Sequence, residues 1–165
     1  RSYGIGPMAS HIFARISTRM MHPGPLDTNA VGLIGHWNVE GVQLALPGRR
    51  EETIRWTENF EWLEGKFFMI HRVQGHIGAA ELTCTEVIAN EEIHSFDNYG
   101  RHQVWNHWFE DDRWMIQGFW REEGNHQVRC TSRFVGPDRR ESIWERSSGT
   151  DGWVLSWRMV AVRVV

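Results

Sequence analysis

The chain has 165 residues and a formal net charge of −3, a length that suits one domain with its own core. Acidic and basic residues are mixed throughout, so no basic patch predicts binding to nucleic acid. No apolar run approaches the roughly 20 residues that span a bilayer, and no secretory segment is visible, which together predict a cytoplasmic protein without membrane contact. Ten tryptophans are the unusual feature, and so many large rings must either fill a core or line a cavity.

The N-terminal segment, residues 1–25, has a different pattern from the rest of the chain. Residues 1–7 do not begin with methionine and have the character of an expression remnant, with Met8 as the natural start. The apolar residues that follow fall at helical spacing, and two prolines end the segment. We expect a short helix or arm packed on the main domain. The alternatives are a lid over the mouth of the main domain and a strap onto a second subunit in a homodimer.

Residues 26–165 are expected to form the main domain, beginning with a short helical turn around Leu26–Leu33. Alternation of large apolar and polar residues, interrupted by turn residues, then predicts about ten short strands, whereas Gln74–Gly78 is expected to be a turn. The expected strands are His36–Leu46, Glu52–Leu63, Phe67–Val73, Glu81–Ala89, Glu91–Phe96, Arg101–Phe109, Arg113–Arg121, His126–Val135, Arg140–Arg146 and Trp153–Val165. Sequential, hairpin-linked strands usually pair with their neighbours. The fold class is therefore all-β, a single antiparallel up-and-down β-barrel of about 8–10 strands.

A Gly-x-Trp motif, Gly35-His36-Trp37, opens the first strand. The chain resembles a lipocalin-like (calycin) family of largely uncharacterised bacterial proteins in this motif and in several later pieces. Those pieces are Phe60 to Phe67, His71-Arg72, Phe96 to Gly100, Trp114-x-x-x-Gly118, Trp144 to Ser147 and Asp151-Gly152-Trp153. The resemblance implies a barrel whose tryptophan closes one end. An arginine of the last strand, Arg158 or Arg163, is expected to stack on that ring.

Acidic residues on apolar strand faces are the first candidates for chemistry. Glu58 shares a strand face with Trp56, Phe60 and Trp62, and Glu86 has a similar setting on a later strand. A carboxyl group desolvated there would have a raised pKa and could act as a general acid or base. The alternatives are a salt bridge to an inward arginine, or a bulge that turns the side chain outward.

The pair His71-Arg72 lies on a strand that is otherwise apolar on both faces, so one of the two must point inward. An inward His71 would form an acid–base pair with Glu58 on the adjacent strand. An inward Arg72 would instead bind a ligand carboxylate or enolate through two hydrogen bonds. A third interpretation makes His71 a hydrogen-bonded core residue.

Other chemistries lack support in the sequence. His102 and His107 should face opposite sides of a regular strand, and no pair of residues has metal-ligand spacing, so neither a metal nor a cofactor is predicted. The serines on strands lack the glycines of a nucleophile elbow. Cys84 and Cys130 are expected to be reduced core thiols.

Two functions therefore remain open. The first is binding of a small hydrophobic or aromatic molecule in a tryptophan-rich cavity, with Arg72, Trp56, Phe60, Trp62, Trp105 and Trp120 as ligand-binding residues. The second is a small cofactor-independent enzyme, an isomerase, cyclase, lyase or hydrolase, that uses Glu58, His71 and Glu86. A barrel packed shut by its tryptophans is the third interpretation, and a cavity below roughly 300 Å³ would weaken both functions.

Overall fold

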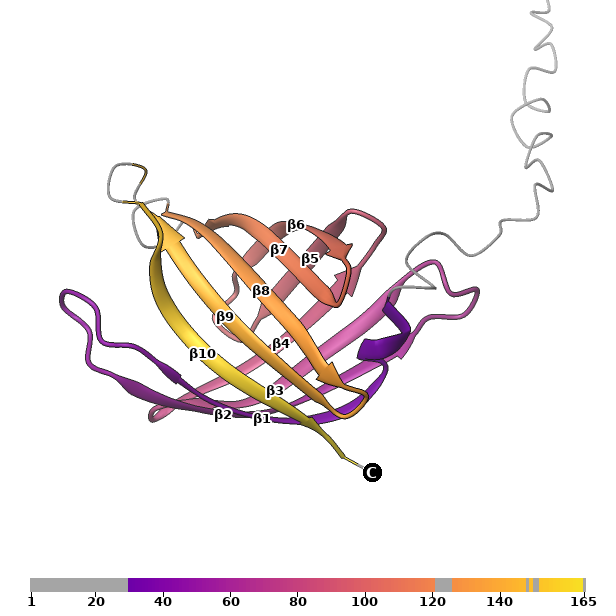
Figure 1. The fold of residues 1–165 in the computed structure, drawn as a ribbon, viewed down its shortest axis with the longest axis horizontal. Helices are drawn as coiled ribbons and strands as arrows, with labels where there is room; N and C mark the ends of the chain where they lie inside the picture. Colours follow the sequence, from indigo (N-terminus) through magenta and orange to yellow (C-terminus); the bar gives the residue numbers. More distant parts are fainter. Residues whose placement is uncertain (1–29, 121–125, 148, 150–151, 165) are drawn as a thin grey trace, which may run out of the picture.

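The computed structural model describes residues 30–120, 126–147, 149 and 152–164 (Figure 1). The described residues form one closed antiparallel barrel of ten strands, preceded by the short 3₁₀-helix η1 (Val31–Leu33). The predicted N-terminal arm, and the first part of the predicted helical turn, lie outside the described residues. The division into an arm and a barrel therefore stays a prediction.

The strands follow one another around the barrel in chain order, and β1 pairs with β10 to close it. Their bounds are β1 Gly35–Gln43, β2 Glu52–Trp62, β3 Met69–Ile77, β4 Ala80–Ile88, β5 Glu92–Asp97, β6 His102–Glu110, β7 Arg113–Trp120, β8 His126–Gly136, β9 Arg139–Ser147 and β10 Val154–Arg163. The all-β, antiparallel up-and-down barrel predicted from the sequence is confirmed.

Strand β2 shows why these segments become strands. Ile54, Trp56, Glu58 and Phe60 are buried, and the residues between them are exposed or half-buried. Side chains of a strand point alternately to its two faces, so one face of β2 fills the barrel and the other meets solvent. The same alternation runs along β3, β6 and β7.

The predicted turn at Gln74–Gly78 is wrong, because β3 continues to Ile77 and the chain turns only at Gly78 and Ala79. Gly75 has a different role from that of a turn glycine. A Cβ atom at Gly75 would lie 2.2 Å from the carbonyl oxygen of Arg55 on β2. The glycine therefore permits close contact between two backbones, and a sequence pattern does not separate this role from a turn.

Trp37 closes the end of the barrel beside η1. Its indole N–H donates to the carbonyl oxygen of Leu33 at 2.7 Å, and the guanidinium of Arg163 lies 4.2 Å from its ring centre. Arg163 also donates to the carbonyl oxygens of Ile34 and Gly32. The predicted stacking of a last-strand arginine on the tryptophan is confirmed for Arg163, whereas Arg158 is exposed on the outer face.

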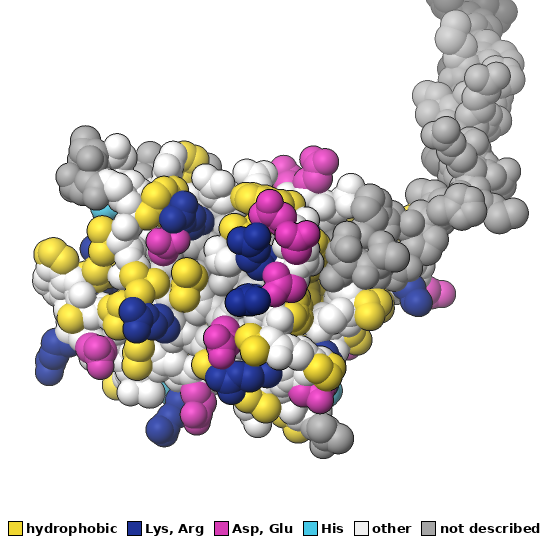
Figure 2. Space-filling model, viewed as in Figure 1, with side chains coloured by type: hydrophobic (Ala, Val, Ile, Leu, Met, Phe, Trp, Pro, Cys, Tyr) yellow, Lys and Arg dark blue, Asp and Glu magenta, His cyan; other side chains and the backbone are white. Residues whose placement is uncertain are grey.

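The outer face carries mixed charge. Figure 2 shows acidic and basic side chains interspersed on the face seen in Figure 1. On β8 and β9, Arg129 pairs with Glu145 at 2.6 Å, and Arg139 pairs with Glu141 at 2.9 Å. Within the described ranges, no helix is long and apolar enough to cross a membrane.

Candidate ligand-binding site

The barrel encloses a cavity of about 150 Å³, called here the interior cavity. Its lining includes the ionisable residues Glu58, His71, Glu86, Asp97, Arg101 and Arg140. Six tryptophans form much of the rest of the wall. The cavity therefore joins a large aromatic surface to a small set of charged groups, which is the usual make-up of a small-molecule site.

The six wall tryptophans are Trp56, Trp105, Trp114, Trp120, Trp144 and Trp157, and all but Trp114 are connected by ring contacts with one another. Trp157 is the central ring, with centroids 6.3 Å from Trp56, 5.5 Å from Trp120 and 5.8 Å from Trp144. Trp105 contacts Trp144 edge-on at 6.0 Å. Edge-to-face contacts of this kind hold aromatic rings in fixed orientations. The wall presents fixed ring faces and edges to whatever occupies the cavity.

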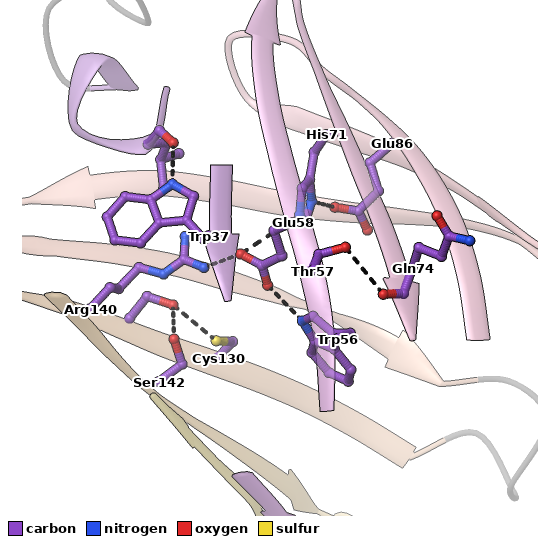
Figure 3. Close-up of polar contacts among 12 residues, drawn as sticks. Trp37, Trp56, Thr57, Glu58, His71, Gln74, Glu86, Cys130, Arg140 and Ser142 are labelled. Atoms are coloured by element: carbon purple, nitrogen blue, oxygen red, sulfur yellow. Dashed lines mark hydrogen bonds and ion pairs between the residues drawn. The ribbon is translucent and has the colours of Figure 1, made fainter. Parts of the chain in front are cut away.

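Glu58 lies at the centre of the polar cluster (Figure 3). Its carboxylate accepts a hydrogen bond from the Trp56 indole N–H at 3.0 Å and forms a buried ion pair with Arg140 of β9. Both side chains are almost fully buried, with 7 % of Glu58 and 4 % of Arg140 exposed. Of the alternatives open for Glu58, the salt bridge to an inward arginine is the one found.

This pairing reverses the expected electrostatics of Glu58. Burial by itself would raise the pKa of the carboxyl group, but the charges of Arg140 and His71 and the hydrogen bond from Trp56 outweigh it. The pKa therefore lies below 4.5, and Glu58 is a carboxylate at neutral pH. The expectation of a raised pKa for Glu58 is wrong.

His71 and Glu86 form a second pair inside the barrel, on the adjacent strands β3 and β4. The Nδ1–H of His71 donates to Oε2 of Glu86 at 2.8 Å (Figure 3). The imidazole stacks on the Phe60 ring with centroids 3.8 Å apart. His71 is thus held by a hydrogen bond at its edge and by a ring against its face.

The second nitrogen of His71 is the unsatisfied one. Nε2 is buried, lies 3.9 Å from Oε2 of Glu58, and has no hydrogen-bond partner among the described residues. A histidine that lines a cavity, is oriented through Nδ1 by a carboxylate and has no partner at Nε2 is arranged to accept or deliver a proton. Glu58, His71 and Glu86 are therefore brought together, although the closest contact of His71 is with Glu86.

Arg140 is surrounded by aromatic rings. Its guanidinium carbon lies 5.4 Å from the Trp37 ring centre, 5.5 Å from that of Phe60 and 5.9 Å from that of Trp114. Its Nε and Nη1 have no hydrogen-bond partner within the described part of the chain. The ring faces and the Glu58 carboxylate together offset the cost of burying the cation.

His107 lies inside the barrel. The sequence predicts that it and His102 face opposite sides of their strand. Its Nε2–H donates to the carbonyl oxygen of Ala89 at 2.7 Å, and its Nδ1 accepts from the Trp114 indole at 3.2 Å. Burial lowers the pKa of His107 below 6.5. His102 is exposed on the outer face, where it stacks on Phe96. The prediction that the two histidines face opposite sides is confirmed.

Three of the predicted ligand-binding residues do not line the interior cavity. Arg72 is on the outer face, 52 % exposed and paired with Glu61, so its expected role as an inward carboxylate binder is wrong. Phe60 is buried beneath His71, and Trp62 is half-buried against the core. Trp56, Trp105 and Trp120 do line the cavity.

The sequence interpretation missed Arg140, Trp144 and Trp157. Period-two alternation could have placed Trp144 and Trp157 in the barrel wall, because each is followed by a charged residue, Glu145 and Arg158, that favours the outer face. No comparable pattern in the sequence predicts that Arg140 points into the barrel. It stands between two other charged residues, and its partner Glu58 is 82 positions away.

The two cysteines, Cys84 and Cys130, are both free thiols, as expected. Burial raises the pKa of each to about 12, so neither is a thiolate nucleophile at neutral pH. Cys130 contacts Ser132, whose hydroxyl lies 2.7 Å from that of Ser142. Among the described residues, no group of three or more histidine, cysteine, aspartate or glutamate side chains is placed to hold a metal ion.

Comparison with known proteins relates the barrel to two solved structures. No protein-family model and no curated protein matches the sequence. Among solved structures, the chain is similar to Rv2717c from M. tuberculosis, with 15% identity, a TM-score of 0.61 and coverage of 87% of this chain and 100% of that one. It is also similar to the S-type phycobiliprotein lyase CPES from Guillardia theta, with 11% identity, a TM-score of 0.55 and coverage of 81% and 89%. These likenesses, with the closed barrel and its Trp37 end, define a lipocalin-like (calycin) fold.

Proposed function

We propose that the protein binds a small, largely aromatic molecule in the interior cavity. The observation that carries this proposal is the group of five packed tryptophans in the cavity wall, which shares the cavity with a buried polar cluster. Indole faces contribute a large contact area with little loss of side-chain entropy, because their neighbours already hold them. The polar cluster would orient the ligand. The phycobiliprotein lyase shares only the fold, so its ligand class supports the proposal by analogy.

The volume of the cavity limits the ligand. About 150 Å³ is below the roughly 300 Å³ under which both functions are expected to weaken. An apolar cavity of about 150 Å³ holds one benzene. The interior cavity therefore accommodates about one aromatic ring. A larger ligand must extend toward the open end of the barrel.

The test is a binding titration with benzene, phenol and indole, followed by isothermal titration calorimetry. We expect heat of binding, and an affinity for indole weakened roughly two- to tenfold by Trp157→Leu, because ring–ring contacts contribute about 0.5–1.5 kcal/mol. Trp153→Leu is the matched control, since Trp153 lies against Arg129 outside the interior cavity. Failure of every probe to bind would mean that the barrel is packed shut, and the proposal would be abandoned.

A second candidate function is acid–base catalysis in the same cavity, favoured by the unsatisfied Nε2 of His71. In this function His71 exchanges a proton with the substrate, Glu86 orients the imidazole, and ionised Glu58 stabilises the imidazolium. The reaction would be an isomerisation, cyclisation, elimination or hydrolysis without a cofactor.

Catalysis is separated from simple binding by the variant His71→Gln. If the protein is an enzyme, a ligand found in the titration is converted by the wild type, and His71→Gln binds it but loses about 10²–10⁴-fold in rate. Product analysis by mass spectrometry supplies the readout. A ligand that binds both proteins and is recovered unchanged from both leaves binding as the function.

A further inference from the structure

A second cavity, of about 450 Å³, lies at the open end of the barrel and is called here the mouth cavity. It is bounded by the β1–β2 hairpin, which extends past the ends of the other strands in Figure 1. The mouth and interior cavities share four lining residues, Leu82, Arg101, Trp120 and Trp157. Because the same side chains form walls of both, the two cavities are adjacent compartments of one site.

The two compartments differ in charge. The charged residues lining the interior cavity are three carboxylates and two guanidinium groups, together with His71. Those lining the mouth cavity are Arg49, Arg50 and Arg101 with the single acid Glu52, a net charge of +2. Asp97 pairs with Arg101 at 2.5 Å. Even when Asp97 is counted with the mouth cavity, the net charge of that cavity stays positive. An anionic group is therefore favoured at the mouth and disfavoured deeper in the barrel.

An unused hydrogen-bond donor belongs to a residue that both compartments share. The Nε1 atom of Trp120 is buried and has no hydrogen-bond partner within the described ranges, and Trp120 lines both cavities. An indole N–H only donates, and a buried donor without a partner costs free energy. A ligand acceptor atom at this junction would satisfy it.

We propose that the ligand is an aromatic carboxylate, with its ring between the interior tryptophans and its acidic group in the mouth cavity. The carboxylate accepts from the Trp120 indole N–H and lies among Arg49, Arg50 and Arg101. This inference rests on the proposed binding function and adds the charge and orientation of the ligand. It also explains how an interior that accommodates one ring serves a larger molecule.

The test compares three probes with the same ring and chain but different end groups: 3-phenylpropionate, 3-phenylpropanol and 3-phenylpropylamine. Affinities are measured by fluorescence titration at low salt. We expect the carboxylate to bind about tenfold more tightly than the alcohol, since a charge-assisted hydrogen bond is roughly twice as strong as a neutral one. The amine should bind most weakly, and added salt should reduce the advantage of the carboxylate. In ¹⁵N-edited NMR spectra, the Trp120 indole resonance should shift more with the carboxylate than with the amine.

Variants of the mouth-cavity arginines test whether the preference for the carboxylate arises there. Arg50→Gln should reduce the advantage of the carboxylate over the alcohol several-fold, and the double variant Arg49→Gln/Arg50→Gln should reduce it further. Arg55→Gln, at an exposed arginine that lines the groove on the outer face of the barrel, is the matched control and should leave it unchanged. Equal binding of carboxylate and alcohol, or tighter binding of the amine, overturns this inference and leaves the aromatic-binding function intact. Binding of none of the three overturns both.

Discussion

Arg140 on β9 and Glu58 on β2 form an ion pair inside the barrel, between strands that are separated in the sheet by β1 and β10. The pair ties two separate parts of the wall together at the interior cavity, which both residues line. It also decides the protonation state of Glu58. One contact therefore bears on both the stability of the barrel and the chemistry of the site.

Replacing Arg140 by methionine should strongly destabilise the protein. The change leaves the Glu58 carboxylate buried without its cation, which costs about 3–5 kcal/mol in comparable cases. Urea unfolding followed by tryptophan fluorescence measures the loss. The control is Arg72→Met, which breaks the exposed pair with Glu61 and should cost about 0–1 kcal/mol. Similar losses in the two variants would show that the buried pair contributes little.

Glu58 should give the stability of the protein a distinct dependence on acid pH. Because its folded-state pKa is lowered below 4.5, its contribution is complete above about pH 4.5 and is lost as the pH falls through the folded-state pKa. Glu58→Gln should therefore be less stable than wild type at pH 7, and the difference should shrink between pH 4.5 and 3. A difference that stays constant over this range would contradict the lowered pKa. Urea midpoints at successive pH values supply the measurement.

His107 should make the stability of the protein depend on pH in a higher range than Glu58 does. Its folded-state pKa is lowered below 6.5 by burial, so the unfolded chain binds the proton more readily. Stability associated with His107 is then complete above about pH 6.5 and falls as the pH decreases through the folded-state pKa. His107→Gln should flatten the pH dependence just below pH 6.5. NMR titration of the His107 ring provides an independent check, and a midpoint at or above 6.5 would refute the prediction.

Arg163→Lys should loosen the closed end of the barrel. Lysine keeps the charge but does not reproduce a planar guanidinium that stacks on Trp37 and reaches the carbonyl oxygens of Gly32 and Ile34. We expect a loss of about 1–2 kcal/mol in the free energy of unfolding. Arg158→Lys on the outer face is the matched control and should have little effect. The prediction fails if both variants unfold at the same urea concentration.

The fold could be predicted because its signal is local. Alternation along β2 correctly placed Trp56 and Glu58 in the interior, and turn residues correctly separated most strands. On β3 the residues before His71 are apolar at every position, so the sequence did not decide whether His71 or Arg72 points inward. The register of β3 against β2, with His71 opposite Phe60, decides it.

The site could be predicted only in part, because its decisive contacts are not local. The Arg140–Glu58 pair joins residues 82 positions apart, and this contact lowers a pKa that the local apolar setting of Glu58 was expected to raise. The mouth cavity likewise depends on which hairpins meet at the open end. The homodimer and the N-terminal arm stay predictions.

The closure of the barrel has a consequence for how the chain folds. Every pairing except β1 with β10 joins consecutive strands, so most of the sheet can form through short loops as the chain emerges. The β1–β10 pairing must close a loop of more than a hundred residues, from Trp37 to Arg163, and loop closure slows such contacts. Until then β1 keeps an unpaired edge that other chains can join. The interval before β10 joins β1 is therefore the stage at which we expect aggregation to compete with folding.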